Sequence, residues 1–224
     1  MRKVNYIERN TISCPYVILC EGRDCEGFLI TYLNSEALKK CDDRFSTSIQ
    51  VFDFKGISNL GSFMKEFKNR EGYNKVRKIL VIRDAEDDYE KASASIKRAL
   101  ENNGIKSPEN VYQWNKGEID VGFLLLPTCD DKPINGTLED LCVKLLKDDY
   151  RDEVLKCEEA FFNELKSNNY RKLRHVFKSK LHTYFSVTED YISAKVGEAA
   201  KWGAFDWESK ELDSLKEFIA MGFE

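Results

Sequence analysis

The chain has 224 residues, a formal net charge of −4 and a sequence pI of about 5.5. This balance argues against a broadly basic nucleic-acid-binding surface, although it leaves room for a local basic patch. Hydrophobic residues make up 42% and charged residues 33%, which predicts a packed core under a heavily charged surface. We expect a single domain over residues 1–224, with an α/β core over about 14–148 and a helical C-terminal portion over about 149–224.

The first residues, MRKVNYIERNTIS, contain no apolar core of the kind that signal peptides carry. No stretch approaches the ~20 apolar residues that span a bilayer. The seven cysteines are an odd number without a C-x-x-C pair, which indicates reduced thiols rather than a disulfide framework or a zinc site. We therefore expect a soluble, cytoplasmic protein with no membrane partner, and the sequence does not indicate its oligomeric state.

Apolar runs alternate with amphipathic segments along the first two thirds of the chain. This alternation predicts a parallel sheet with right-handed crossovers, flanked by helices. Gly117 lies in the turn between the last two runs, so these two strands are able to pair as a hairpin. The expected strands are 16–21, 48–54, 77–84, 110–114 and 121–127.

The expected helices begin at recognisable caps. Asp24 is a candidate cap for the helix after the first strand, and Thr137 with Asp140 forms a T-x-x-D capping pattern. Asp87 and Asp88 complement the N-terminal dipole of the helix at 87–104. Another amphipathic helix covers 59–70, and helical segments dominate from about residue 150 onward.

Two of the apolar strands end in acidic residues. The first ends at Glu21, and the third ends in RDAEDD, which includes Asp84 and Glu86. If the strands are neighbours, their backbones lie roughly 4.8 Å apart and their acids project over one sheet edge. Carboxylates so close need a shared proton or a cation, and Mg²⁺ or Mn²⁺ is suited to such oxygen ligands. Gly22 would let the chain turn and let a bulky anionic substrate approach the backbone.

A solvated loop acid or a helix cap remains the ordinary explanation for Glu21 taken alone. The metal interpretation requires Glu21, Asp84 and Glu86 to converge within about 6 Å, a separation that one Mg²⁺ could bridge. The metal interpretation fails if the Glu21 side chain points into the core or pairs with Arg83.

The Glu-Gly strand end and the later Asp-x-Glu strand end together resemble the TOPRIM domain of topoisomerases, primases and related nucleases. The segments CEGRDCEGFL, VGFLLLPTCDDKPINGTLEDLC and KSKLHTYFS resemble a family of small stand-alone TOPRIM-like proteins. That family is similar to the nuclease domain of the overcoming-lysogenization-defect (OLD) proteins. The resemblance covers roughly residues 14–200 and implies a TOPRIM-like α/β fold.

The resemblance also implies roles for individual residues. Glu21 would be a metal ligand and the catalytic general acid or base, and Asp84 and Glu86 would be metal ligands. Glu139 would help to hold a second metal ion, although acids in the first turn of a helix also stabilise its dipole. Lys180 would be a basic catalytic residue near the site, able to steady a phosphate oxygen.

The chain departs from the OLD-like pattern at Cys25, where that pattern often has an acid. Asp24 and Glu26 flank this position and are candidate substitutes, and we expect Gly22 and Asp24 to contact the substrate. OLD proteins also carry an ATPase domain, whereas no G-x-x-x-x-G-K-[ST] run occurs here. We expect Cys25 itself to be a buried helix residue, because no neighbouring base is evident that would activate a thiolate.

Three further groups have ordinary explanations. The basic run at 169–180 is either a solvated helix face or a phosphate-contacting surface; its cations are Arg171, Lys172, Arg174, Lys178 and Lys180. We expect His175 and His182 to have surface or packing roles. We expect Trp202 and Trp207 to pack in the core rather than to stack on bases.

The leading function hypothesis is Mg²⁺-dependent phosphoryl transfer, in the form of hydrolysis of phosphodiester bonds in DNA or RNA. The alternative is a non-catalytic TOPRIM-like module that binds nucleic acid, a nucleotide or a protein partner. A metal-dependent phosphatase that acts on a small substrate is a third option.

Overall fold

The computed structural model describes residues 11–147, 151–168 and 176–224. Its centre is a five-stranded sheet in the order β2-β1-β3-β5-β4, in which only β4 runs antiparallel to its neighbour. The expected mostly parallel α/β sheet and its closing hairpin are confirmed. The strands are β1 (Tyr16–Cys20), β2 (Ile49–Asp53), β3 (Lys78–Asp84), β4 (Gln113–Asn115) and β5 (Asp120–Leu126).

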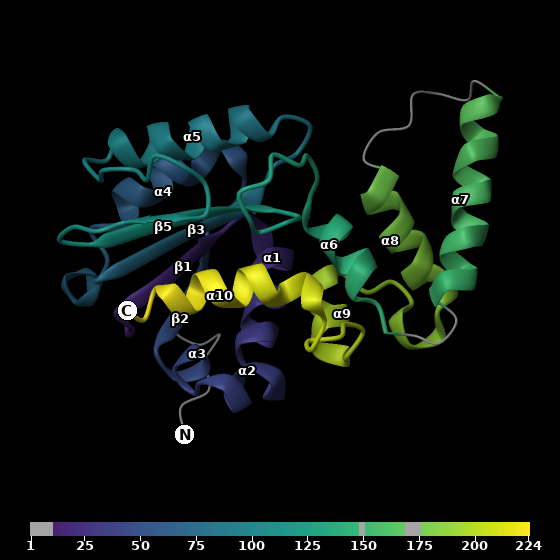
Figure 1. Cartoon of the computed structure of the whole chain (residues 1–224), viewed down its shortest axis with the longest axis horizontal. Helices are drawn as coiled ribbons and strands as arrows, with labels where there is room; N and C mark the ends of the chain where they lie inside the picture. Colours follow the sequence, from purple (N-terminus) through teal and green to yellow (C-terminus); the bar gives the residue numbers. More distant parts are fainter. Residues whose placement is uncertain (1–10, 148–150, 169–175) are drawn as a thin grey trace.

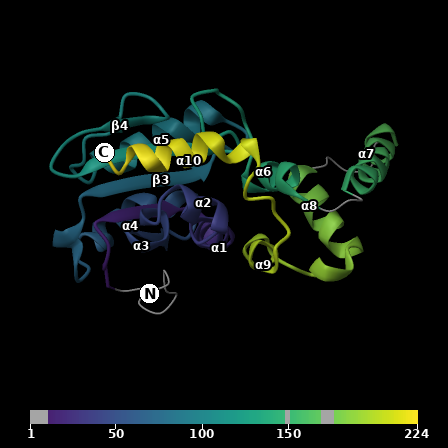
Figure 2. The ribbon, with the colours of Figure 1, turned by 60° about the horizontal axis from the view of Figure 1, so that its bottom comes forward.

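Helices cover both faces of this sheet (Figure 1). One face is covered by α4 (Leu60–Phe67) and α5 (Tyr89–Glu101), and the other by α1 (Gly22–Leu33), α9 (Val196–Trp202) and α10 (Asp213–Met221). Figure 2 gives a second view of the sheet and of these helices. The other helices are α2 (Glu36–Cys41), α3 (Arg44–Thr47), α6 (Leu138–Leu145), α7 (Arg151–Ser167) and α8 (Val176–Val187), with short 3-10 turns at Ile57–Asn59, Tyr73–Lys75, Glu189–Tyr191 and Lys210–Leu212.

The central strands are apolar on both faces, and successive side chains enter opposite layers because side chains alternate along a strand. On β1, Ile18 faces the α1 layer and Leu19 faces the α4–α5 layer. On β3, Leu80 and Ile82 face the α1 layer, whereas Ile79 and Val81 face the α4–α5 layer. This alternation determines the layer toward which each acid at a strand end is directed.

The helix starts agree with the expected caps in two cases and differ in a third. The Asp88 carboxylate accepts a hydrogen bond from Lys91 N, and Asp140 accepts one from Thr137 N at 2.7 Å. The prediction that Asp24 caps α1 is wrong, because the helix begins three residues earlier in the chain, with Glu21 at the cap position. Asp24 instead accepts a hydrogen bond from Gly197 N of α9 at 3.2 Å.

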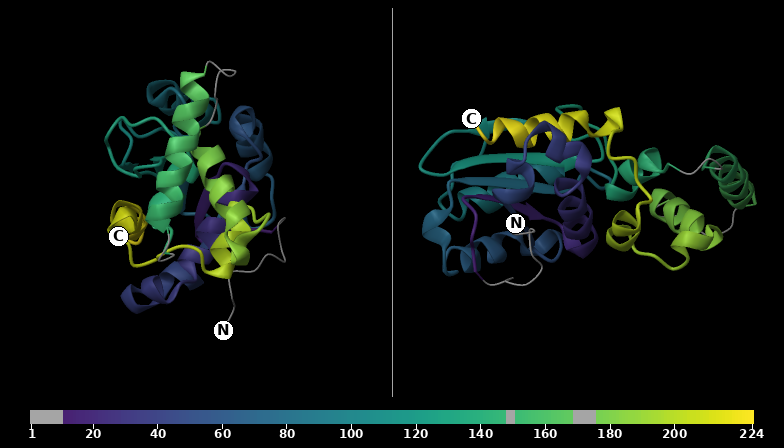
Figure 3. Two further views of the ribbon diagram at one scale, coloured as in Figure 1. Left: turned by 90° about the vertical axis from the view of Figure 1, so that its right-hand side faces the viewer. Right: turned by 90° about the horizontal axis from the view of Figure 1, so that it is seen from below.

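The C-terminal helices are not a separate body. The Trp114 ring stacks on Phe218 of α10, and its Nε1 donates to the Phe218 carbonyl oxygen. The expected division near residue 148 therefore separates two kinds of secondary structure rather than two cores. Helix α7 lies at the outer end of the molecule beside α8 (Figure 3). None of the helices in the described part of the chain is long and apolar enough to cross a bilayer.

The two tryptophans near the C-terminus behave differently. Trp207 packs in the core against Phe28, Tyr32 and Phe205, as expected. The expected packing role of Trp202 is wrong, since 57% of this residue is exposed. Trp202 is the last residue of a short helix whose buried positions are taken by smaller residues.

Helices α1 and α9 approach so closely because a glycine of each helix lies at the contact. A Cβ on Gly27 would lie 2.9 Å from Gly197 Cα, which is backbone and cannot rotate away. We predict that Gly27→Ala lowers the free energy of unfolding by about 1–3 kcal/mol through overpacking. Chemical denaturation measures this change.

The matched control is Gly61→Ala in α4, where a Cβ would meet nothing within 4 Å. That substitution should be neutral, or stabilising by up to about 1 kcal/mol, because alanine favours the helix. Equal effects of the two substitutions would contradict the close α1–α9 contact.

Candidate active site at the carboxyl edge of the sheet

Glu21 lies one residue beyond β1, at the carboxyl edge of the sheet. Cys20 is paired with Ile82, so Glu21 comes opposite Arg83 on the neighbouring parallel strand. Side chains opposite one another on parallel strands point to the same face, and Arg83 Nε lies 3.5 Å from Glu21 Oε2. Burial raises the pKa of Glu21, as do Glu86 and Asp53, while Arg83 and a backbone hydrogen bond from Ile57 oppose the rise.

Asp84 is the last residue of β3, and alternation directs it to the α1 layer rather than to the side of Glu21. Its Oδ1 accepts a hydrogen bond from Leu138 N, the first residue of α6, at 2.9 Å. Burial raises the pKa of Asp84 well above its ordinary value, and Glu139 and Glu21 add to the effect. Asp84 is therefore a carboxyl group that needs a proton or a nearby cation.

Glu86 secures the loop that precedes α6. Its backbone N–H donates to the Gly136 carbonyl oxygen and its carbonyl oxygen accepts from Gly136 N, both at 2.8 Å. Glu86 has a φ of 56°, which is an unusual conformation for a residue with a side chain. The backbone of the D-x-E motif thus places α6, and with it Glu139, at the end of β3.

Glu139 is buried, with 5% of its surface exposed, and it pairs with Lys178 Nζ at 3.1 Å. Burial alone would raise the pKa of Glu139, but a hydrogen bond from the Thr137 side chain and the Lys178 ammonium outweigh it and lower this pKa. Glu139 also lies in the first turn of α6, so its position suits both the helix dipole and a role at the edge.

The lysine at this acidic group is Lys178, a residue that the sequence resemblance did not assign. Lys180 is two positions further along α8, on a different side of the helix, and acts electrostatically on Glu158 of α7. Arg171, Lys172, Arg174 and His175 lie outside the described residues. His182 is exposed and contacts Phe185, in agreement with a surface or packing role.

Asp53, at the end of β2, also belongs to this edge and was missed. Its Oδ1 accepts hydrogen bonds from Gly22 N at 2.8 Å and from Lys55 N at 2.6 Å. Gly22 has a φ of 85°, and a Cβ there would meet nothing within 4 Å, so the turn after Glu21 is open to its surroundings. The sequence signal that could have identified Asp53 is the segment SIQVFDF, a third apolar strand with an acid near its end.

Cys25 is a buried residue of α1, as expected, and its thiol is hydrogen-bonded to that of Cys20. This hydrogen bond favours the thiolate, but burial together with Asp84, Glu21 and Asp53 outweighs it and raises the pKa of Cys25. A buried thiol with a raised pKa does not act as a nucleophile at neutral pH. Cys25 therefore occupies the position of the expected acid without supplying a charge.

Among the described residues, Arg83 and Lys178 form ion pairs with acids of this edge, Glu21 and Glu139 respectively. Across residues 11–147, 151–168 and 176–224, no three Asp, Glu, His or Cys side chains converge to form a ready-made metal cage. The Arg83–Glu21 ion pair is the arrangement that counts against a metal at Glu21. However, Glu21 Oε2 is buried without a hydrogen-bond donor in this part of the structure, so the ion pair leaves an acceptor oxygen unsatisfied.

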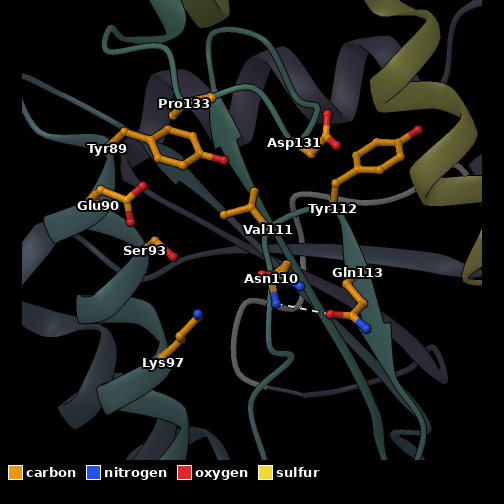
Figure 4. Close-up of a pocket in the computed structure, with 10 residues that line it drawn as sticks. All are labelled: Tyr89, Glu90, Ser93, Lys97, Asn110, Val111, Tyr112, Gln113, Asp131 and Pro133. Carbon is orange, nitrogen blue, oxygen red and sulfur yellow. Dashed lines mark hydrogen bonds between the residues drawn. The ribbon is translucent and has the colours of Figure 1, made fainter.

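A separate hollow of about 510 Å³ lies between α5 and the segment that leads into β4. Tyr89 projects into it toward Val111, and Lys97 lies further along α5 (Figure 4). Asn135 accepts from Tyr89 N, which connects this hollow to the loop before α6. None of the acids discussed above lines it. Its walls are formed by Tyr89, Glu90, Ser93, Lys97, Asn110, Val111, Tyr112, Gln113, Asp131 and Pro133.

A family model described as "Protein of unknown function (DUF3226)" matches residues 15–224. The chain belongs to this family. Neither the curated proteins nor the solved structures gave a match. The family thus spans the whole sheet, the acidic edge and the C-terminal helices, and it carries no assigned activity.

The raised pKa of Asp84 gives a pH-dependent prediction. The folded state holds the proton more tightly than the unfolded state does, so stability falls as the pH rises above the ordinary aspartate pKa. Asp84→Asn removes this ionisation and retains an oxygen for Leu138 N. We predict a higher melting temperature than wild type at pH 8, and a smaller difference at pH 4. A lower melting temperature for Asp84→Asn at both pH values would contradict this placement of Asp84.

Proposed function

We propose that this protein is a Mg²⁺-dependent phosphoryl-transfer enzyme with a TOPRIM-like core, acting on phosphodiester bonds in DNA or RNA. The observation that carries the proposal is the position of Glu21, Asp84 and Glu86 at the carboxyl ends of the neighbouring strands β1 and β3, with Glu139 of α6 brought to the same edge. Ligands of open α/β sheets bind beyond this edge. The Glu-Gly and Asp-x-Glu strand ends, which resemble TOPRIM motifs, lie on the neighbouring strands β1 and β3.

Buried carboxylate groups that lack sufficient compensating charge support the proposal of a cation at this edge. Glu21 Oε2 is a buried acceptor without a donor among the described residues, and Asp84 is surrounded by other carboxylates. In the proposal Glu21, Asp84 and Glu86 hold the ion, and Glu139 contributes from α6. Mg²⁺ or Mn²⁺ bound there would polarise the phosphate and lower the pKa of an attacking water.

The residues around the acids have supporting roles. Lys178 is held at the edge by Glu139 and is placed to offset charge on a phosphate oxygen, which is the role that the resemblance gave to Lys180. Gly22 leaves the turn after Glu21 open, and Asp24 holds α9 through Gly197 N. A metal ion held by Glu21 would replace its contact with Arg83, which at 3.5 Å is long for a charge-assisted hydrogen bond.

A non-catalytic module is the second candidate, and specific features favour it. Arg83 already offsets the charge of Glu21, and Cys25 replaces an expected acid with a neutral thiol. The hollow beside α5 offers aromatic, hydroxyl and charged groups that would suit a nucleotide or nucleoside without any involvement of the acidic edge.

Metal binding is tested by thermal stability. If Glu21 and Asp84 hold Mg²⁺, the ion should stabilise the wild-type fold by about 2.7 kcal/mol when present at about 100 times its Kd. Glu21→Gln should lose most of this gain, whereas the exposed Glu66→Gln of α4 should retain it. Differential scanning fluorimetry across a Mg²⁺ titration measures both, and an equal gain in the two variants would exclude Glu21 as a ligand.

Catalysis is tested separately. With Mg²⁺ or Mn²⁺, wild type should nick supercoiled plasmid or cleave single-stranded RNA, and Glu21→Gln should lose at least roughly 100-fold in rate because it lacks a metal ligand. Glu66→Gln should cleave at the wild-type rate. Nucleic-acid binding without turnover in any divalent metal, unchanged in Glu21→Gln, would instead support the non-catalytic module.

A further inference from the structure

The hollow beside α5 has the size of a small-molecule site. Its volume is about 510 Å³, within the range of pockets that hold small ligands. Three segments form its walls: α5 at 89–97, the chain at 110–113 that leads into β4, and the loop at 131–133. All three belong to the unbroken range 11–147 of described residues.

Two hydroxyl groups of α5 face this hollow without a protein partner. Tyr89 is 7% exposed and Ser93 is 6% exposed, and neither side chain has a hydrogen-bond partner among the residues that the structure describes. Residues four apart lie on one face of a helix, so both project to the same side. Buried polar groups are normally hydrogen-bonded, and these two hydroxyls are therefore available to a ligand.

Acidic groups surround the Tyr89 hydroxyl, which points into the hollow between Glu90 and Asp131 (Figure 4). Burial raises the pKa of Tyr89 to about 12, and Glu90, Asp130 and Asp131 add to the effect, so the hydroxyl stays protonated at neutral pH. Asp130 pairs with Lys132 at 3.1 Å. Glu90 and Asp131 have no ion pair within the described ranges, so two carboxylates that line the hollow keep their charge uncompensated there.

A lysine lines the hollow further along α5. Lys97 lies one turn beyond Ser93, and its ammonium group donates a hydrogen bond to the backbone carbonyl oxygen of Glu109. Figure 4 shows this lysine away from the Tyr89 hydroxyl. The part of the hollow around Tyr89 therefore has a negative potential, which attracts cations and repels phosphate groups.

We propose that this hollow binds a small organic amine, whose ammonium group lies next to the Tyr89 hydroxyl in the field of Glu90 and Asp131. A neutral ligand would displace water from these carboxylates without offsetting their charge, which is unfavourable. The Tyr89 ring stabilises a nearby cation through its π face. The side-chain amides of Asn110 and Gln113 offer hydrogen bonds to the rest of the ligand. This inference is independent of the metal chemistry proposed at the sheet edge.

The test compares amines with alcohols that have a hydroxyl in place of each ammonium group. The pairs are putrescine with butanediol, tyramine with tyrosol, and glucosamine with glucose. Isothermal titration calorimetry on the full chain should show that at least one amine binds about tenfold or more tightly than its alcohol, since hydrogen bonds to charged groups are the stronger. Binding of none of the amines, or equal binding of amine and alcohol in every pair, would overturn the proposal.

Substitutions locate the bound amine. The double variant Glu90→Gln/Asp131→Asn should weaken its binding by about tenfold, and Tyr89→Phe, which keeps the ring, by about threefold. Melting curves should stay close to wild type, because both acids are exposed and the hydroxyl has no partner among the described residues. The matched control is Glu66→Gln, which removes a charge from an exposed position of α4. Weakening by Glu66→Gln equal to that of the double variant would indicate general attraction to an acidic surface and overturn the site.

Adenosine and adenosine monophosphate are the competing ligands. We expect both to bind more weakly than the amine, because adenosine lacks a cation and the monophosphate adds negative charge. Tighter binding of adenosine would overturn the proposal and assign the hollow to a nucleoside. Tighter binding of the monophosphate would show that Lys97, rather than the acids, governs what the hollow accepts.

Discussion

The backbone pairing between Glu86 and Gly136 is the interaction on which the arrangement of the acidic edge depends. It joins the end of β3 to the start of α6, and the hydrogen bond from Leu138 N to Asp84 reinforces the connection. Glu139 therefore lies beside Asp84, although 54 positions separate Asp84 from the start of α6. Through its ion pair with Lys178, Glu139 in turn connects this edge to α8.

This arrangement concentrates carboxylates where the protein offers few donors. Packed interiors normally satisfy each buried charge, and here Arg83 and Lys178 do so only in part. Retaining such a cluster lowers the stability of the fold, which is a common property of functional sites.

Much of the secondary structure followed from periodicity alone. The apolar runs at 16–21 and 77–84 became neighbouring central strands, and the T-x-x-D pattern at Thr137 began a helix as expected. The prediction that Asp24 caps α1 was wrong because Gly22, which has a positive φ, starts this helix immediately after the strand. Asp24 therefore lies inside the first turn of α1. The prediction that Trp202 packs in the core was wrong because an aromatic residue at the end of a helix does not have to contact the core.

The sequence by itself determined that acids follow the buried strands, and therefore that they gather at one edge of a parallel sheet. It could not determine which acids would face each other. Register placed Glu21 opposite Arg83, and strand alternation directed Asp84 toward the other layer, where it meets Glu139. Only the tertiary structure selected Lys178 over Lys180, because two positions along a helix turn a side chain to a different side. Local sequence patterns predict where the strands end. Contacts between distant segments depend instead on strand register and packing, which no single segment of the sequence determines.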